Sequence, residues 1–411
     1  MTIPHLTNYV AFAIPFFFLL IGIELIVDKI KNGHHYRFSD SITNLSCGIG
    51  NQVVNATIKL LALGAYYWLQ SHYSLFKIPV DSPIYWLLCL ICVDFAYYWY
   101  HRLSHEINFM WAMHIVHHQS EEYNLTVALR QAMFARLIAF AFYLPIAFIG
   151  FPIEMFFVVA QFQLIYQFWI HTPYVPKLGF LEYIFMTPSQ HRVHHGKNSI
   201  YLDKNHGGTF SIWDRLFGTY REETVKVYFG TTKPLKSWNP IWSNFVYWRE
   251  MIDVAKTKST FSEKIKVFLK GPKDMPIPAE GLPEVTYKYD TPKMKWMNRY
   301  VFVHFVLAVL CLGLYLKQAK VEFDFSFYYL GAIILVSILN FGAMFELKRW
   351  VRWSELLRMV MIVGFLYITF QNGFINHIGW LVIGAILSLI SWTVMNRLLD
   401  RYQTGLTPIS S

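Results

Sequence analysis

Nine histidines of this chain gather in three tight groups and one single position, each beside a long apolar segment. They are His101, His105, His114, His117, His118, His171, His191, His194 and His195. Imidazole is the commonest metal-binding side chain, and its lone pair coordinates only when the ring is neutral, as it mostly is near pH 7. Nine rings exceed what one tetrahedral zinc ion can use. The number of histidines therefore predicts two metal ions.

The spacing within each group suits a shared ligand surface. Residues three and four apart lie on the same face of a helix, and all three groups contain such pairs. In the doublets His117-His118 and His194-His195, adjacent rings diverge by about 100° around the helix axis. The two members of a doublet can therefore serve different metals.

Asp94 precedes the first histidine group inside an apolar segment. Asp94, Tyr98, His101 and His105 are spaced by 4, 3 and 4 residues, which makes one continuous helical stripe. A carboxylate in a membrane-spanning segment is costly and is a functional candidate by default. We expect Asp94 to act next to the metal centre by accepting the second ring N–H of a ligand histidine. The alternative is a polar residue that packs one helix against another.

The composition places these groups in a membrane protein. The 411 residues are 55% hydrophobic and only 15% charged, whereas soluble domains carry about 25% charged residues. Apolar runs of roughly spanning length lie near 7–27, 50–70, 83–100, 131–149, 152–170, 296–316, 324–345, 355–371 and 375–396. The sequence predicts an all-α integral membrane protein with about nine transmembrane helices.

The predicted topology brings the histidine groups to one side of the membrane. The runs at 131–149 and 152–170 form a hairpin, so the chain returns to the side it left and all nine histidines face one compartment. Most of the excess Lys and Arg residues fall in loops on that same side, which the positive-inside rule makes the cytoplasm. We expect a cytoplasmic histidine-rich cap in the bacterial inner membrane or the endoplasmic reticulum. The net charge of +10 lies beside spans and indicates no nucleic-acid partner.

Changes in composition divide the chain into four parts. Residues 1–82 are expected to form N-terminal transmembrane helices, and 83–230 the metal-binding catalytic core. Residues 231–295 mix Trp, Tyr and Lys in a pattern typical of interfacial helices, followed by a Pro-rich connector. Residues 296–411 are expected to form C-terminal transmembrane helices.

The surroundings of the histidines favour oxidative chemistry. Imidazole binds zinc, copper, iron and nickel. A two-metal site at the edge of an apolar region fits the activation of O₂ for attack on an unactivated C–H bond, so we predict two iron ions with a lipid substrate and O₂. A histidine-rich metal transporter is the non-enzymatic alternative. Transport would require ionisable residues near the middle of several spans, whereas these histidines lie at one edge.

Three segments resemble the fatty acid hydroxylase/sterol desaturase superfamily and, within it, the alkylglycerol monooxygenases: 117–131, 187–198 and 203–220. The resemblance implies a non-haem di-iron monooxygenase whose ligands are the nine histidines. It further implies hydroxylation of the ether-linked carbon of an alkylglycerol, with tetrahydrobiopterin as the reductant. Glu121, followed by Glu122, matches an acidic position associated with pterin use in those enzymes. Both are also open to a simpler interpretation as solvated loop carboxylates.

Some positions depart from the superfamily pattern or leave its function open. Gln190 replaces a frequent histidine, and His206 replaces a usual tyrosine, so His206 is either an added metal contact or an ordinary loop histidine. Asp214 is expected to order a turn by pairing with an arginine. The alternative function is a fatty-acyl, sterol or aminolipid hydroxylase or desaturase that draws electrons from a separate ferredoxin or cytochrome.

Overall fold

The computed structural model describes residues 6–276, 287–319, 324–371 and 378–405, and these form helices without any extended strand. They divide into two compact units, the first made of 1–235 and 243–288 and the second of 236–242 and 289–411. The long helices are α1 (Tyr9–Lys31), α2 (Phe38–Tyr73), α3 (Pro83–Glu106), α7 (Arg136–Ile149), α8 (Ile153–Trp169), α11 (Trp242–Lys256), α13 (Lys295–Gln318), α14 (Phe325–Phe345), α15 (Val351–Gln371) and α16 (Ile378–Gly405). The short ones are α4 (Asn108–Ala112), α5 (Ile115–His118), α6 (Leu125–Ala128), η1 (Gly179–Tyr183), α9 (Pro188–His194), α10 (Ile212–Leu216), α12 (Phe261–Leu269) and η2 (Pro272–Asp274).

Each predicted span coincides with a helix, but not every helix is long and apolar enough to cross a membrane. Six of the described helices are long and apolar enough to cross a membrane, namely α1, α3, α13, α14, α15 and α16. Helices α7 and α8 have 14 and 17 residues, or about 21 and 25 Å, against a hydrocarbon core of about 30 Å. Nine crossings are therefore not confirmed, and the first residues of the last predicted run lie outside the described part of the chain.

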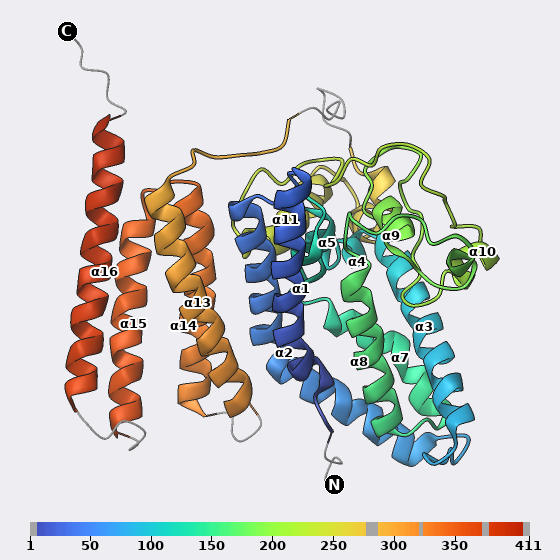
Figure 1. Ribbon diagram of the computed structural model, residues 1–411. Coiled ribbons are helices and arrows are strands. Elements are labelled where there is room, and N and C mark those ends of the chain that lie inside the picture. Colours follow the sequence, from blue (N-terminus) through green and yellow to red (C-terminus); the bar gives the residue numbers. More distant parts are fainter. Residues whose placement is uncertain (1–5, 277–286, 320–323, 372–377, 406–411) are drawn as a thin grey trace. The chain divides into compact units, whose positions relative to one another are not determined.

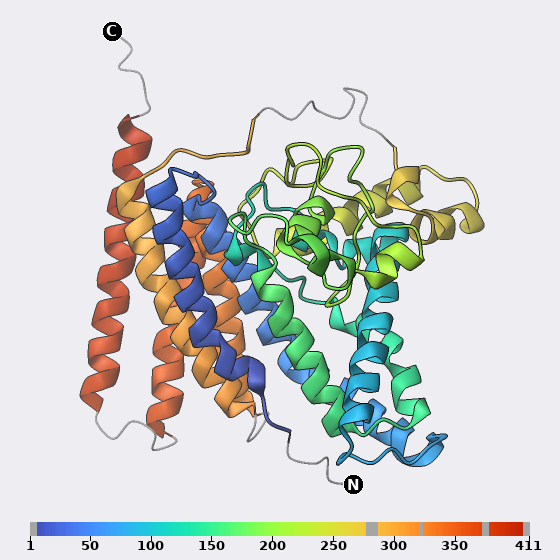
Figure 2. The ribbon, with the colours of Figure 1, turned by 45° about the vertical axis from the view of Figure 1, so that its right-hand side comes forward.

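The predicted hairpin between α7 and α8 forms at Gly150. This residue has φ +118°, and a Cβ added there would lie 2.0 Å from the carbonyl oxygen of Phe76, so only glycine fits the turn. The core of the first unit lies between α2, α3, α7 and α8, where Tyr66, Val93 and Met155 are buried. Figures 1 and 2 show the short helices and loops gathered at one end of this bundle. The packing therefore fixes α3 and α8, whose C-terminal ends enter the histidine-rich region.

The polar first half of α2 faces protein. Asn51 donates to the carbonyl of Ala132 (2.6 Å), and Asn55 donates to the carbonyl of Met133 (3.0 Å). The N–H of Met133 in turn donates to Asn244 (2.8 Å). These bonds hold 132–133 in an irregular conformation, which is why α7 begins only at Arg136.

In the second unit, α13, α15 and α16 share a buried polar network. Arg358 pairs with Glu355 through Nε and Oε2 at 2.8 Å and also donates to Nδ1 of His304 (3.1 Å). His304 contacts Ser391 (2.8 Å), whose hydroxyl donates to Tyr300 (3.2 Å). Because the ion pair is nearly fully buried and satisfied, it fixes how these helices pack.

Candidate metal centre

Four separate parts of the first unit bring the nine histidines together. His101 and His105 lie in the last turns of α3, His171 follows α8, and the remaining six come from the α5 region and from α9 with its C-cap. The structure sorts them into a first group, His101, His105, His114, His118 and His194, and a second group, His117, His171, His191 and His195. Within each group, one ring nitrogen of every residue lies within 4.8 Å of those of the others. Each doublet is split between the two groups, as predicted.

The hydrogen bonds of the rings show which nitrogens are left to coordinate. Nδ1 of His117 contacts the carbonyl of Arg130 (3.0 Å), and Nδ1 of His171 that of Gln167 (2.8 Å). A carbonyl oxygen only accepts, so both Nδ1 atoms carry the proton and both Nε2 atoms are lone-pair acceptors. These two acceptors nevertheless lie only 3.2 Å apart. Two nitrogens that bind one metal at right angles, each with a metal–nitrogen distance of ~2.1 Å, lie ~3 Å apart. The observed distance is close to this value, so the donor set fits a cation.

Burial keeps the rings neutral and their nitrogens available. Desolvation lowers the pKa of His117 to about 4 and that of His191 well below its usual range. The same cause acts on His118, His171, His194 and His195. Nε2 of His105 and of His194 is buried without a hydrogen-bond partner. Unpartnered buried nitrogens of this kind cost about 1–3 kcal/mol each, a cost that a bound metal would remove.

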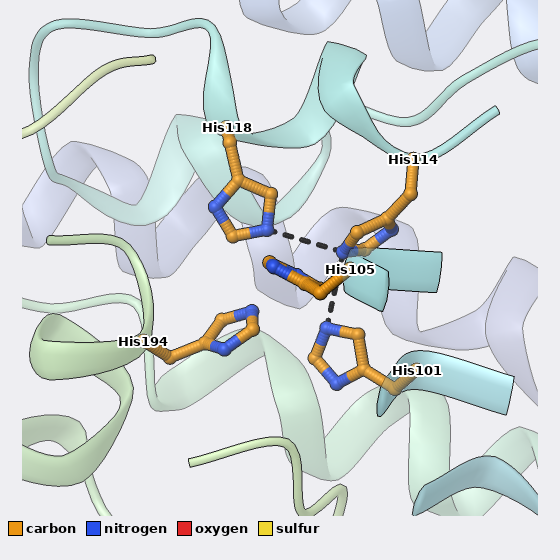
Figure 3. Close-up of side chains that lie close together, drawn as sticks. All are labelled: His101, His105, His114, His118 and His194. Carbon is orange, nitrogen blue, oxygen red and sulfur yellow. Dashed lines mark hydrogen bonds between the residues drawn. The ribbon is translucent and has the colours of Figure 1, made fainter. Parts of the chain in front are cut away.

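The first group forms a square pyramid of imidazoles (Figure 3). Around one octahedral metal, adjacent ring centres lie about 4.5 Å apart and opposite ones about 6.4 Å. His114 and His194 are 6.5 Å apart, whereas the four distances along the square formed with His101 and His118 are 4.3–4.9 Å. His105 lies 4.8–5.4 Å from all four and occupies the apex. Among the described residues, the position opposite His105 receives no histidine.

The second group has a more open arrangement. His117 and His191 are opposite, with ring centres 6.4 Å apart. The other five distances are 4.3–5.1 Å, whereas a tetrahedral site would make all six equal at about 5.2 Å. These four rings would hold a metal ion in an arrangement other than a tetrahedron. The two groups touch, because the rings of His118 and His195 stack at 4.5 Å.

Residues 203–206 orient three of the five rings in the first group. The carboxylate of Asp203 lies 3.5 Å from Nδ1 of His105, the carbonyl of Lys204 is 3.0 Å from Nδ1 of His194, and the carbonyl of His206 is 2.8 Å from Nδ1 of His101. The segment is tightly coiled, with φ +54° at Asp203 and +56° at Asn205. The sequence pattern did not identify Asp203 as a partner of a ligand histidine. Asp and Asn do adopt this left-handed backbone conformation more readily than most residues.

Asp214 holds this segment in place. Its carboxylate accepts from the backbone N–H of His206 (2.7 Å) and Gly207 (2.8 Å) and from the hydroxyl of Thr219 (2.7 Å). The expected pairing with an arginine is therefore wrong, because backbone donors occupy the carboxylate. Burial raises the pKa of Asp214 to about 6.

The two departures from the superfamily pattern lie outside both histidine groups. His206 is fully buried rather than a surface loop residue, and its ring lies 5.0 Å from that of His105. It is thus beside the apex of the first group and not opposite it. The side chain of Gln190 donates to the carbonyl of Glu182 (2.7 Å) and accepts from Thr187 (3.1 Å), which caps α9.

Asp94 binds a loop instead of a histidine. It accepts from the backbone N–H of Thr209 (2.6 Å) and Phe210 (3.1 Å), the indole of Trp213 (2.9 Å) and the amide of Gln163 (2.6 Å). The predicted bond to a ligand histidine is wrong, because the nearest ligand on α3, His101, lies seven residues or about 10 Å further along the helix.

Glu121 and Glu122 lie together beside several cations. Glu122 pairs with Nε of Arg37 (2.5 Å) and with Nζ of Lys288 (2.6 Å), and only 2% of its side chain is exposed. Glu121 lies at a longer distance, 3.8 Å, from Arg37. Its negative charge favours the protonated form of Lys197, whose pKa is nevertheless lowered by burial. Neither glutamate is a solvated loop carboxylate.

The part of the chain that carries the histidines is similar to known proteins. Residues 86–219 match the family model named Fatty acid hydroxylase. The alkylglycerol monooxygenase of Xenopus tropicalis is 36% identical over 365 residues, which cover 87% of this chain and 81% of the relative. That of Homo sapiens is 38% identical over 315 residues, 74% of this chain and 71% of the relative. Ornithine lipid hydroxylase of Rhizobium tropici is 30% identical over 135 residues, 33% of this chain and 41% of the relative. No solved structure matches the chain.

Proposed function

The chain belongs to the alkylglycerol monooxygenase family and carries a fatty acid hydroxylase domain, and from this membership we propose that it oxidises ether lipids. It is an O₂-dependent oxidoreductase of lipids, and the proposed substrate is an alkylglycerol. Hydroxylation of the ether-linked carbon gives a hemiacetal that breaks down to glycerol and a fatty aldehyde. One oxygen atom enters the C–H bond and the other leaves as water, with two electrons and two protons from tetrahydrobiopterin.

We propose that each histidine group holds one iron ion. The observation that supports this most strongly is the facing pair of acceptor nitrogens in His117 and His171. The non-tetrahedral ring arrangements favour iron over zinc, which prefers four tetrahedral ligands. When bound, the irons supply the reduction of O₂ beside the lipid. The protein keeps the rings neutral by burial and orients them through backbone carbonyls.

We propose Glu121 as the carboxylate that binds the pterin. A carboxylate can accept two N–H groups from the 2-amino-4-oxopyrimidine edge of tetrahydrobiopterin. Two cations already hold Glu122 at 2.5 and 2.6 Å, which assigns it a structural role. The carboxylate of Glu121 lies 3.8 Å from Arg37, and Gly230 approaches so closely that an added Cβ would lie 3.2 Å from Cγ of Glu121.

Glu121→Gln is expected to weaken pterin binding without loss of iron. The amide cannot accept two hydrogen bonds as the carboxylate does, so KM for tetrahydrobiopterin should rise by about tenfold or more. Steady-state aldehyde release at varied pterin concentration measures this, with iron content as the check on integrity. Glu222→Gln, at an exposed glutamate, is the matched control. An unchanged KM in Glu121→Gln would remove Glu121 from the pterin site.

Asp203→Ala is expected to weaken metal binding in the first group only. Loss of a partner that orients a ligand histidine typically costs about 10–100-fold in metal affinity. A chelator titration should release one of the two ions at a correspondingly lower chelator concentration and leave the other unchanged. Glu222→Ala, at an exposed residue elsewhere in the same region, controls for loss of surface charge. Equal weakening of both ions would show that Asp203 supports the whole fold and not His105.

The second candidate function is hydroxylation of another lipid with electrons from a protein donor. It is favoured by the matches to ornithine lipid hydroxylase and to methylsterol monooxygenase 1 of Rattus norvegicus, which cover 33% and 39% of this chain. Such an enzyme would use a ferredoxin or cytochrome in place of the pterin.

We further propose that the histidines face the cytoplasm. The Lys and Arg residues that flank the spans support this orientation. The proposed catalytic core remains 83–230. The membrane segments at 1–82 precede it, and the connector region 231–295 and the membrane segments at 296–411 follow it.

Aldehyde release tests the proposal directly. Membranes that contain the protein are incubated with an alkylglycerol, with and without tetrahydrobiopterin, and His194→Ala serves as the blank. The proposal expects pterin-dependent aldehyde that is absent from the variant. Iron-loaded protein that releases no aldehyde from the alkylglycerol, but oxidises another lipid with a ferredoxin, would establish the second candidate instead.

A further inference from the structure

Two short elements of the first unit carry large apolar side chains on their surface. In η1, Phe180 is 76% exposed and Tyr183 is 65% exposed, and in α10, Leu216 is 67% and Ile212 is 42% exposed. The N–H of Ser211 donates to the carbonyl of Ile184 (2.9 Å), which joins the two elements. We call these exposed side chains the η1–α10 surface. Contiguous exposed apolar groups of this kind mark a contact with a partner or a membrane.

The η1–α10 surface continues the outward face of a candidate membrane span. Phe95, in α3, is 39% exposed and packs edge-on against Trp213 of α10, with ring centres 5.0 Å apart. The same side of α3 exposes Leu87, Leu88 and Ile91 toward its N-terminus. Both views show α10 beside the C-terminal half of α3 (Figures 1 and 2). An exposed apolar strip therefore runs along α3 and reaches α10.

The hydrogen bonds of Asp94 explain how the 207–214 loop can lie beside the candidate membrane span α3. Non-helical backbone near lipid must have its polar groups satisfied by protein. Asp94 accepts from the backbone N–H of Thr209 and Phe210 and from the indole of Trp213. The buried carboxylate thus supplies acceptors that water cannot supply there.

Basic and aromatic groups border this surface on its polar side. The guanidinium of Arg215 lies 4.6 Å from the ring centre of Tyr183 and 3.7 Å from that of Tyr220. Arginine and tyrosine are typical of the headgroup layer of a bilayer.

We propose that the η1–α10 surface lies on the membrane and inserts Phe180, Ile212 and Leu216 among the lipids of the leaflet nearest the histidines. Its continuity with the exposed face of α3 identifies the occupant as lipid and not a second protein. The contact holds the loop that leads from the 203–206 segment against the bilayer. It does not depend on which lipid the enzyme oxidises.

Site-directed fluorescence in nanodiscs tests this contact. Leu216→Cys and Phe180→Cys are labelled with an environment-sensitive dye, and Glu222→Cys, which is exposed in the same region, is the matched control. Unaltered protein gives the background from the native cysteines, of which Cys47 and Cys89 are buried. Doxyl-labelled phosphatidylcholine reports contact with lipid, and iodide reports contact with water. Iron content confirms that each variant is folded.

The proposal expects doxyl lipid to quench the dye at 180 and 216 several-fold more strongly than at 222, with the reverse order for iodide. Equal iodide quenching at 216 and 222 would show that the surface faces water. Protection of 216 from both quenchers would show that protein covers it. Either result overturns the proposal.

Discussion

His191→Ala is expected to abolish lipid oxidation and to remove one of the two metal ions. His191 lies opposite His117 in the second group, and its Nε2 is 2.9 Å from that of His171. Without it, the proposed site would keep only three imidazoles, too few to hold the ion tightly. Aldehyde release should fall to the level of membranes that lack the enzyme, and metal analysis should find one ion per chain.

His118→Ala should give the same loss through the first group, because His118 stands at a corner of its square. The matched control is His72→Ala, which changes an exposed histidine far along the sequence from both groups. That variant should keep full activity and both ions. A His191→Ala protein that still binds two ions per chain would contradict the assignment of His191 as a ligand.

Asp94→Ala is expected to destabilise the protein by several kcal/mol. The substitution leaves two buried backbone N–H groups, an indole and an amide without their acceptor, and each unsatisfied group costs about 1–3 kcal/mol. Thermal denaturation of the purified protein in detergent should therefore show a much lower midpoint. Activity should be lost because the 207–214 loop no longer supports the 203–206 segment.

Asp94→Asn separates this structural role from a chemical one. Asparagine keeps one acceptor oxygen, so it should restore part of the thermal stability and of the activity. An Asp94→Ala protein that melts normally but has no activity would show that the carboxylate takes part in the reaction. In that case the loop contacts would not be its main function.

The local spacing of the histidines explains part of how the structure sorts them into two groups. Histidines four residues apart share a group, as His114 and His118 do and as His191 and His195 do, whereas adjacent rings such as His194 and His195 fall in different groups. The hairpin of α7 and α8, which the sequence also predicted, brings histidines that are far apart in the sequence to the same end of the first unit. The assignment of these rings as iron ligands remains a proposal.

The sequence could not reveal which partners the buried carboxylates choose. Asp94 bonds to Phe210, which lies 116 residues away, and Asp203 contacts His105 across the fold. Such pairings depend on the path of an irregular loop, and the sequence of such a loop has no hydrophobic periodicity from which its path could be predicted. Likewise, hydropathy gave α7 a longer span than it has, because the carbonyls of Ala132 and Met133 accept bonds from α2. Those tertiary bonds delay the start of the helix.

The most direct test of the central claim is the Mössbauer spectrum of protein enriched in ⁵⁷Fe. A group of five imidazoles and a group of four give two iron environments of different symmetry. We expect two iron ions per chain and two quadrupole doublets of equal area, one of which is lost in His191→Ala. A single iron per chain, or tightly bound zinc in active protein, would contradict it.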